Sequence, residues 1–149
     1  MGAKLDTKLE KLIHPCGFYK NKAKNIKNCC KILVEKYNSE VPHTMEELVE
    51  LPGVGRKTAN VVMCNAFENA EGIAVDTHAK RISNRIGFSK ESDPIKIEQD
   101  LLKVIPKKYL KDVNHLLVYH GRNFCTARNP KCDDCTLKEF CEYFKNNHA

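Results

Sequence analysis

Lys57 follows a glycine-containing turn and has surroundings that suit nucleophilic chemistry. Pro52 and Gly53 interrupt the preceding helical pattern, and Gly53 and Gly55 permit positive φ and the close approach of another backbone. A new helix is predicted to begin at about Arg56, so its N–H groups and positive dipole end form a seat for a phosphate. Positive charge from Arg56 and the dipole favours the neutral amine of Lys57, which could attack an aldehyde and form a Schiff base.

A plain helix–helix connection would have the same turn, with Lys57 as a solvated surface lysine. Taken alone, the turn favours this second interpretation. Asp76, within Ile73-Ala74-Val75-Asp76-Thr77-His78, is likewise well placed to cap a helix. Capping and chemistry are compatible roles for Asp76, because a cap at the edge of a cleft still presents its carboxylate.

Four of the eight cysteines lie close together near the C-terminus: Cys125, Cys132, Cys135 and Cys141. Their spacing, C-x6-C-x2-C-x5-C, places four thiolates within 17 residues, enough to enclose one site. Both zinc and a [4Fe–4S] cluster are compatible with this spacing. The remaining cysteines show no ligand spacing, and Cys64 is expected to be a buried thiol.

The apolar residues recur at helical spacing along most of the chain, and no strand pattern is present, so we predict an all-α fold. Helices are expected over about 5–13, 23–37, 44–50, 56–67, 76–86, 93–105 and 113–120. Thr44 with Glu47 predicts a capping box, and Asp93 before Pro94 predicts another helix start. Gly87 and Gly121 are expected to end their helices, and 68–75 is expected to be a loop.

The composition is that of a basic globular protein: 149 residues, 42% hydrophobic, with a formal net charge of +6. A basic balance suits a polyanionic partner, although charge alone is weak support for nucleic-acid binding. The sequence contains no run of about 18 apolar residues and no apolar stretch typical of a signal peptide. We therefore expect an intracellular protein without a membrane span.

The segment Leu-Pro-Gly-Val-Gly-Arg-Lys-Thr-Ala-Asn-Val-Val, followed by Val-Asp-Thr-His, resembles the helix-hairpin-helix and catalytic segment of the endonuclease III family. These proteins are base-excision DNA repair glycosylases with abasic-site lyase activity. The resemblance runs from about Leu5 to the C-terminus. It implies that Lys57 is the Schiff-base nucleophile, that Asp76 assists it, and that the four C-terminal cysteines hold a [4Fe–4S] cluster.

The same resemblance implies double-stranded DNA carrying a damaged base or an abasic site as the partner. Removal of damaged, oxidised pyrimidines would be followed by β-elimination through the lysine Schiff base. Arg128 and Lys131, between the first two cluster ligands, would contact DNA phosphates without reading sequence. The full set of candidate DNA contacts is Gly53, Val54, Gly55, Arg56, Thr58, His78, Arg128 and Lys131.

The chain is short for a member of this family, and we expect it to begin partway through the helical barrel and to lack the N-terminal helices. We expect residues 1–69 to be the remainder of the barrel with the hairpin, and residues 70–149 to be the iron–sulfur cluster domain. Apolar helix faces should then be left uncovered. Self-association or a separate N-terminal fragment could cover them. The alternatives to an active enzyme are a non-catalytic DNA-binding fragment and one half of a split glycosylase.

Overall fold

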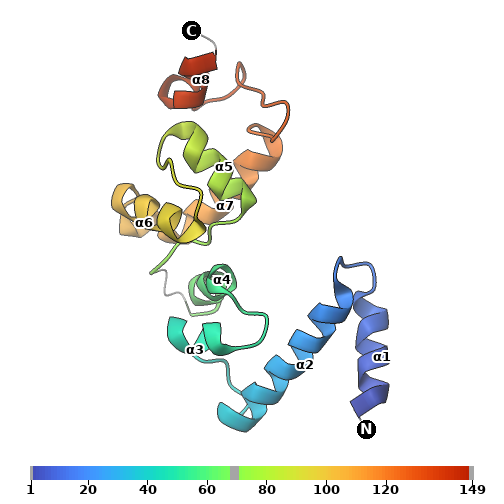
Figure 1. The fold of residues 1–149 in the computed structure, drawn as a ribbon. Coiled ribbons are helices and arrows are strands. Elements are labelled where there is room, and N and C mark those ends of the chain that lie inside the picture. Colours follow the sequence, from blue (N-terminus) through green and yellow to red (C-terminus); the bar gives the residue numbers. More distant parts are fainter. Residues whose placement is uncertain (1, 68–70, 148–149) are drawn as a thin grey trace. The chain divides into compact units, whose positions relative to one another are not determined.

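The computed structural model describes residues 2–67 and 71–147, and over these residues the secondary structure is helical (Figure 1). The predicted all-α class is therefore confirmed. The chain divides into two compact units, Met1–Ala59 and Asn60–Ala149. This division falls inside helix α4 (Arg56–Ala66), whereas the domain boundary predicted between residues 69 and 70 lies outside the described residues and stays a prediction.

The first unit contains three helices and the beginning of a fourth: α1 (Gly2–Ile13), α2 (Tyr19–Lys36), α3 (Met45–Glu50) and the first turn of α4. Helices α1 and α2 pack side by side as a hairpin (Figure 1). The predicted capping box opens α3, because the Glu47 amide donates to Thr44 Oγ1 at 3.3 Å and the Thr44 hydroxyl donates to the Glu47 carboxylate at 2.7 Å.

The turn between α3 and α4 is built as the sequence predicts. Gly53 adopts φ 81°, and the amide of Val54 donates to the Leu51 carbonyl at 3.0 Å. The first bond of α4 joins the Ala59 amide to the Gly55 carbonyl at 3.0 Å. A Cβ on Gly53 would lie 2.9 Å from the Asn25 Cβ on α2, so this position also needs glycine for packing.

The second unit contains the rest of α4 and these elements: α5 (Thr77–Ile86), α6 (Pro94–Val104), η1 (Lys107–Tyr109), α7 (Leu110–Asn123), η2 (Lys138–Phe140) and α8 (Glu142–Asn147). The predicted starts at Asp76 and Asp93 are confirmed, since each carboxylate accepts two backbone amides of the following turn. Gly87 ends α5 in the left-handed region at φ 104°.

Helix α5 packs against α7, α6 and α8, and the core of the second unit forms around it. The buried core residues are Ile73, Val75, Ala79, Ile82, Ile97, Leu101, Leu110, Val113 and Leu117. Ile73 and Val75 belong to the segment between α4 and α5, so the core itself anchors the chain just before Asp76.

Two sequence predictions on α7 are wrong. The helix continues through Gly121 to Asn123 instead of ending at the glycine. A Cβ on Gly121 would come 2.6 Å from His78 Nδ1 and 2.9 Å from Ile82 Cδ1, so the glycine is needed for close packing of α5. The helix also begins earlier than the predicted start at about residue 113, because its first residue is Leu110.

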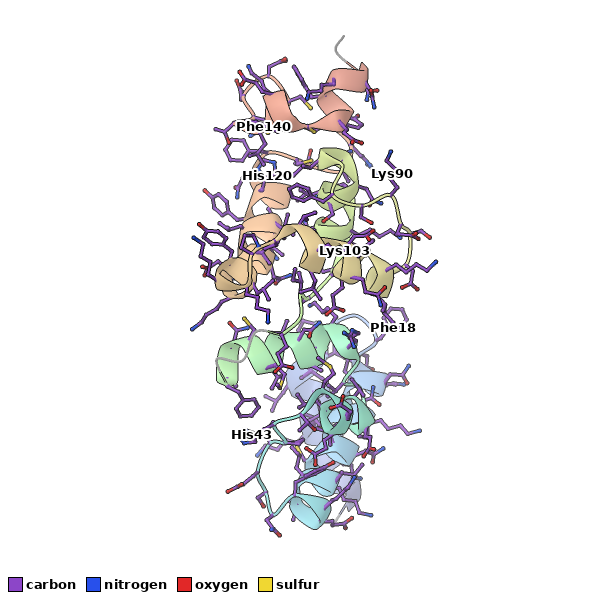
Figure 2. The ribbon with its side chains drawn as sticks, turned by 90° about the vertical axis from the view of Figure 1, so that its left-hand side faces the viewer. Phe18, His43, Lys90, Lys103, His120 and Phe140 are labelled. Atoms are coloured by element: carbon purple, nitrogen blue, oxygen red, sulfur yellow. The ribbon has the colours of Figure 1, made fainter. Side chains whose placement is uncertain are left out.

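The expected uncovered apolar side chains are present among the described residues. Leu12 and Phe18 are 73% and 86% exposed in the first unit. Tyr119 and Phe140 are 63% and 73% exposed in the second unit, and Phe140 is labelled in Figure 2. Within the described part of the chain, no helix is both long enough and apolar enough to cross a bilayer.

Candidate functional site

Lys57 is the second residue of α4 and its side chain is exposed. The amides of Arg56, Lys57 and Thr58 belong to the first helical turn, where a helix offers no internal acceptor. A Cβ on Gly55 would meet no atom within 4 Å, and Gly55 does not use a positive φ. Gly55 therefore leaves open space beside these amides, and of the two turn glycines only Gly53 uses its conformational freedom.

Asp76 lies in the second unit at the N-terminus of α5 and is half-buried. The amides of His78 and Ala79 each donate to Asp76 Oδ1 at 2.8 Å. Both cap bonds end on the same oxygen, so Oδ2 takes no part in the cap. The geometry thus agrees with the expectation that one carboxylate can hold the helix end and also face a reactant.

The other candidate DNA contacts differ in their surroundings. Arg128 and Lys131 are exposed on the loop that follows α7. His78 is instead half-buried on α5, with its Nδ1 3.1 Å from Arg81 Nη2 and close to the backbone of α7 at Gly121. The DNA-contact roles of His78, Arg128 and Lys131 stay predictions.

The four C-terminal cysteines line one cavity of the second unit. The rest of the lining is mixed, with apolar residues such as Ile86 and Phe124 and basic residues such as Arg85 and Lys131. The Cys141 thiol donates to the Arg85 carbonyl at 3.2 Å, and Cys135 Sγ lies 3.7 Å from His120 Nε2. A cavity lined by four thiols suits a cofactor that takes soft sulfur ligands.

Four cysteines around one cavity can supply all the protein ligands of a zinc ion or of a [4Fe–4S] cluster.

Two arginines on α5 connect the helix to the cysteine loop, and sequence analysis did not single them out. Arg85 donates through Nη1 to Cys125 Sγ at 3.3 Å and to the Thr126 carbonyl at 2.7 Å, and through Nη2 to the Ala127 carbonyl at 3.0 Å. Arg81 donates to the Cys125 carbonyl at 3.1 Å. Their i, i+4 spacing was visible in the sequence, but their acceptors lie about 40 residues away.

Burial and mutual charge shape the ionisation of the thiol site. Burial raises the pKa of Cys132, and negative charge on the three other cysteines raises it further. Burial lowers the pKa of His120, which is labelled in Figure 2. Its ring stacks on Phe124, and both residues line the cavity. Bound iron would oppose the shift at Cys132, because a cation stabilises thiolates.

Over the described residues the chain combines helices only with a glycine turn, an exposed lysine after the turn and four cysteines around one cavity. Residues 2–107 match the family model "HhH-GPD superfamily base excision DNA repair protein", and residues 125–141 match "Iron-sulfur binding domain of endonuclease III". The chain is 51% identical to endonuclease III of Synechocystis over 133 residues, and 47% identical to endonuclease III of Escherichia coli K12 over 131 residues.

Solved structures agree with the sequence relatives. A trapped endonuclease III–DNA covalent intermediate superposes with a TM-score of 0.89 at 43% identity, covering 97% of this chain and 68% of that one. A thermostable thymine-DNA glycosylase superposes with a TM-score of 0.84 at 26% identity, with 95% and 66% coverage. The chain therefore belongs to the endonuclease III family of the helix-hairpin-helix superfamily.

Two further facts follow from these matches. The cofactor of the C-terminal loop is a [4Fe–4S] cluster. The matched region covers 89% of this chain but only 61% of the Synechocystis relative, and 88% of this chain but 62% of the Escherichia coli relative.

Proposed function

We propose that this protein acts in base-excision DNA repair, as a glycosylase for damaged, oxidised pyrimidines and as a lyase at abasic sites. The observation that carries the proposal is the exposed Lys57 on the first turn of α4, directly after the glycine turn, in a chain that matches a base-excision DNA repair family. Double-stranded DNA with a damaged base or an abasic site is the proposed partner.

In the first step, the damaged nucleotide leaves the base stack and its sugar becomes accessible. The Lys57 amine forms a bond to C1′ while the C1′–N bond to the base breaks, and the base leaves with that electron pair. Positive charge develops on the sugar as the base departs. The Asp76 carboxylate stabilises this charge, an electrostatic effect that is worth most away from bulk water.

The second step cuts the strand. Loss of a proton from nitrogen and opening of the sugar ring give a Schiff base between Lys57 and C1′. The Schiff base acidifies the C2′ hydrogen, a base removes that proton, and the 3′ phosphate leaves by β-elimination. Water then hydrolyses the Schiff base and restores the lysine.

DNA is held in this proposal by backbone contacts that do not read sequence. The first-turn amides of α4 seat one phosphate beside the open space at Gly55. Gly53, Val54, Arg56 and Thr58 complete the hairpin contact, and the exposed Arg128 and Lys131 bind a second stretch of backbone. Such contacts weaken as salt rises, since they release counterions.

Cys125, Cys132, Cys135 and Cys141 are the proposed ligands of the cluster. The cluster supplies iron–thiolate bonds that cross-link a short C-terminal segment with little apolar core of its own. Arg85 and Arg81 hold the start of this loop against α5. No reaction step on the DNA passes through the cluster.

A second candidate is a DNA-binding fragment that needs another polypeptide for base removal. Partial coverage of the relatives favours it, as do the exposed Leu12 and Phe18 in the first unit. A second copy of the chain or a separate N-terminal fragment would cover such side chains. Under this alternative the hairpin and the cluster loop keep their DNA-binding roles.

Asp76→Asn separates the two chemical steps. We expect roughly 100-fold slower removal of an oxidised pyrimidine, because the amide cannot neutralise the developing positive sugar. Cleavage at a pre-formed abasic site should slow by less than about tenfold, since no base departs in that reaction. Single-turnover cleavage of the two duplexes measures both rates, and equal slowing of both would contradict the role given to Asp76.

If the wild-type chain binds both duplexes but cleaves neither, even as an oligomer or with the N-terminal part of a relative added, the DNA-binding alternative replaces the enzyme.

A further inference from the structure

The backbone between α4 and α5 is held by side chains from three helices. Residues 73–76 have neither helical nor strand structure, although Ile73, Ala74 and Val75 are only 1%, 4% and 7% exposed. Buried peptide groups outside regular structure need other hydrogen-bond partners. Such partners are present here, and they lie directly before the functional residue Asp76.

Both polar groups of the Ile73 backbone are satisfied by one pair of buried side chains. Asn60 on α4 donates through Nδ2 to the Ile73 carbonyl at 3.3 Å, and the Ile73 amide donates to Glu98 Oε1 on α6 at 3.3 Å. Asn60 Nδ2 also donates to Glu98 Oε1 at 2.9 Å. The two side chains are thus bonded to each other as well as to Ile73.

The next residue is held from a third helix, because Asn114 on α7 donates through Nδ2 to the Ala74 carbonyl. Asn60, Glu98 and Asn114 therefore fix two successive peptide groups, and we call these three side chains the clamp. The clamp lies wholly within the second unit.

Gly72 gives an independent indication that the clamp sets the path of this segment. A Cβ on Gly72 would come closer than 3.0 Å to Asn60 Oδ1 and to Glu98 Oε1. Gly72 does not use a positive φ, so its lack of a side chain serves close approach and not an unusual backbone conformation. The chain can pass over the Asn60–Glu98 pair only because residue 72 has no Cβ.

Burying Asn60 and Glu98 costs free energy of folding, so stability alone does not explain this polar pair. Asn60 and Glu98 are 3% and 2% exposed, and a buried amide or carboxyl loses its hydration. Apolar side chains of similar size often stabilise such positions as well or better. The polar pair instead provides conformational specificity, because its hydrogen bonds form only when the Ile73 peptide lies in one position.

We propose that the clamp is a positioning device for Asp76, with Asn60 as its central positioning residue. This inference rests on the proposed function of Asp76 as the carboxylate that stabilises the developing sugar cation. Only Ala74 and Val75 lie between the clamped Ile73 and Asp76, and the Asp76 carboxylate is itself fixed by the α5 cap. Asn60 also belongs to the helix whose first turn carries Lys57.

The test compares Asn60→Ala and Gly72→Ala in the wild-type background and in the Asp76→Asn background. If the clamp acts through Asp76, each variant slows removal of an oxidised pyrimidine by about tenfold or more in the wild-type background, because small misplacement of a reacting group is costly. In the Asp76→Asn background the same variants should change the rate by less than about twofold.

Ser89→Ala is the matched control. Ser89 is 4% exposed in the same unit and donates to Asp100 Oδ2 at 2.8 Å, so its loss also removes a partly buried hydrogen bond. It does not touch the segment before Asp76. Equal slowing by Asn60→Ala and Ser89→Ala, or equal slowing in both backgrounds, would reduce the clamp to a general stabilising feature and overturn the proposal.

Hydrogen exchange tests the clamp independently of any activity of the protein on DNA. The Ile73 amide should exchange faster in Asn60→Ala and Gly72→Ala than in Ser89→Ala, at temperatures where all three are folded. Unchanged exchange at Ile73 would show that the clamp does not hold the segment. A wild-type protein without activity on DNA would contradict the proposed function, and the exchange result would still decide whether the clamp exists.

Discussion

Gly53 and Gly55 have different tasks although a single residue separates them. Gly53 supplies the positive φ of the turn and packs against Asn25, so alanine there should cost about 1–2 kcal/mol through the left-handed conformation alone. Gly55 has ordinary backbone geometry and open space around it. Nothing in the described residues requires a glycine there, and in the proposed function its absent side chain leaves room for a DNA phosphate.

Gly55→Val should separate binding from folding. A side chain beside the first-turn amides would obstruct the phosphate, and we expect roughly tenfold weaker binding to abasic-site DNA. The melting temperature should change little, because the new Cβ meets no protein atom within 4 Å and the change in helix capping costs about 1 kcal/mol.

Fluorescence anisotropy at fixed salt and thermal melting measure the two effects. Ser92→Val, on an exposed turn of the second unit, is the control for added apolar surface. Full affinity in Gly55→Val would mean that the hairpin is only a connection between helices.

Helix α5 connects the segment that carries Asp76 to the cysteine loop of the second unit. Asp76 caps its first turn, while Arg81 and Arg85 extend from its length to the cysteine loop. The Arg85 guanidinium donates to one thiol and two carbonyls, and its Cζ lies 4.7 Å from the centre of the Tyr143 ring. One arginine thus joins α5, the loop and α8.

Arg85→Lys should weaken the cluster loop while leaving the helices folded, because a single ammonium cannot replace three fixed donor directions. Wild-type protein purified without air should hold about four irons per chain and absorb broadly in the visible range. We expect the variant to hold less iron and to lose that absorbance several-fold faster in air.

Arg122→Lys, on the exposed last turn of α7, is the control, and iron analysis with the decay of absorbance is the measurement. Equal rates of absorbance loss in the wild type, Arg85→Lys and Arg122→Lys would show that Arg85 does not stabilise the cluster loop. Stoichiometric zinc in place of iron in the anaerobic wild type would contradict the cofactor itself.

Helix starts were predictable from the sequence because their signals are local. Thr44, Asp76 and Asp93 each bond amides within three residues of themselves, and the structure has helices beginning after each. Gly121 was misjudged because its reason is tertiary, namely the packing of α5 against α7. The arginine contacts and the clamp could not be predicted for the same reason, since Asn60 and Glu98 are 38 residues apart.

At the scale of the whole molecule, the chain is a basic protein with two compact units and uncovered apolar side chains. Family membership and the cluster follow from matches along most of its length. The chemistry assigned to it depends on Lys57, whose exposed position on α4 agrees with a nucleophile and also with a plain surface lysine. A covalent test distinguishes the two.

Borohydride trapping on a duplex with one abasic site is that test, because reduction turns a lysine Schiff base into a stable protein–DNA adduct. We predict an adduct with the wild-type protein and with Lys90→Gln, which removes the same charge from an exposed loop of the second unit. Lys57→Gln should form no adduct while still binding the duplex, since the hairpin amides remain. Equal trapping by wild type and Lys57→Gln would contradict the central claim, because the Schiff base would then come from another amine.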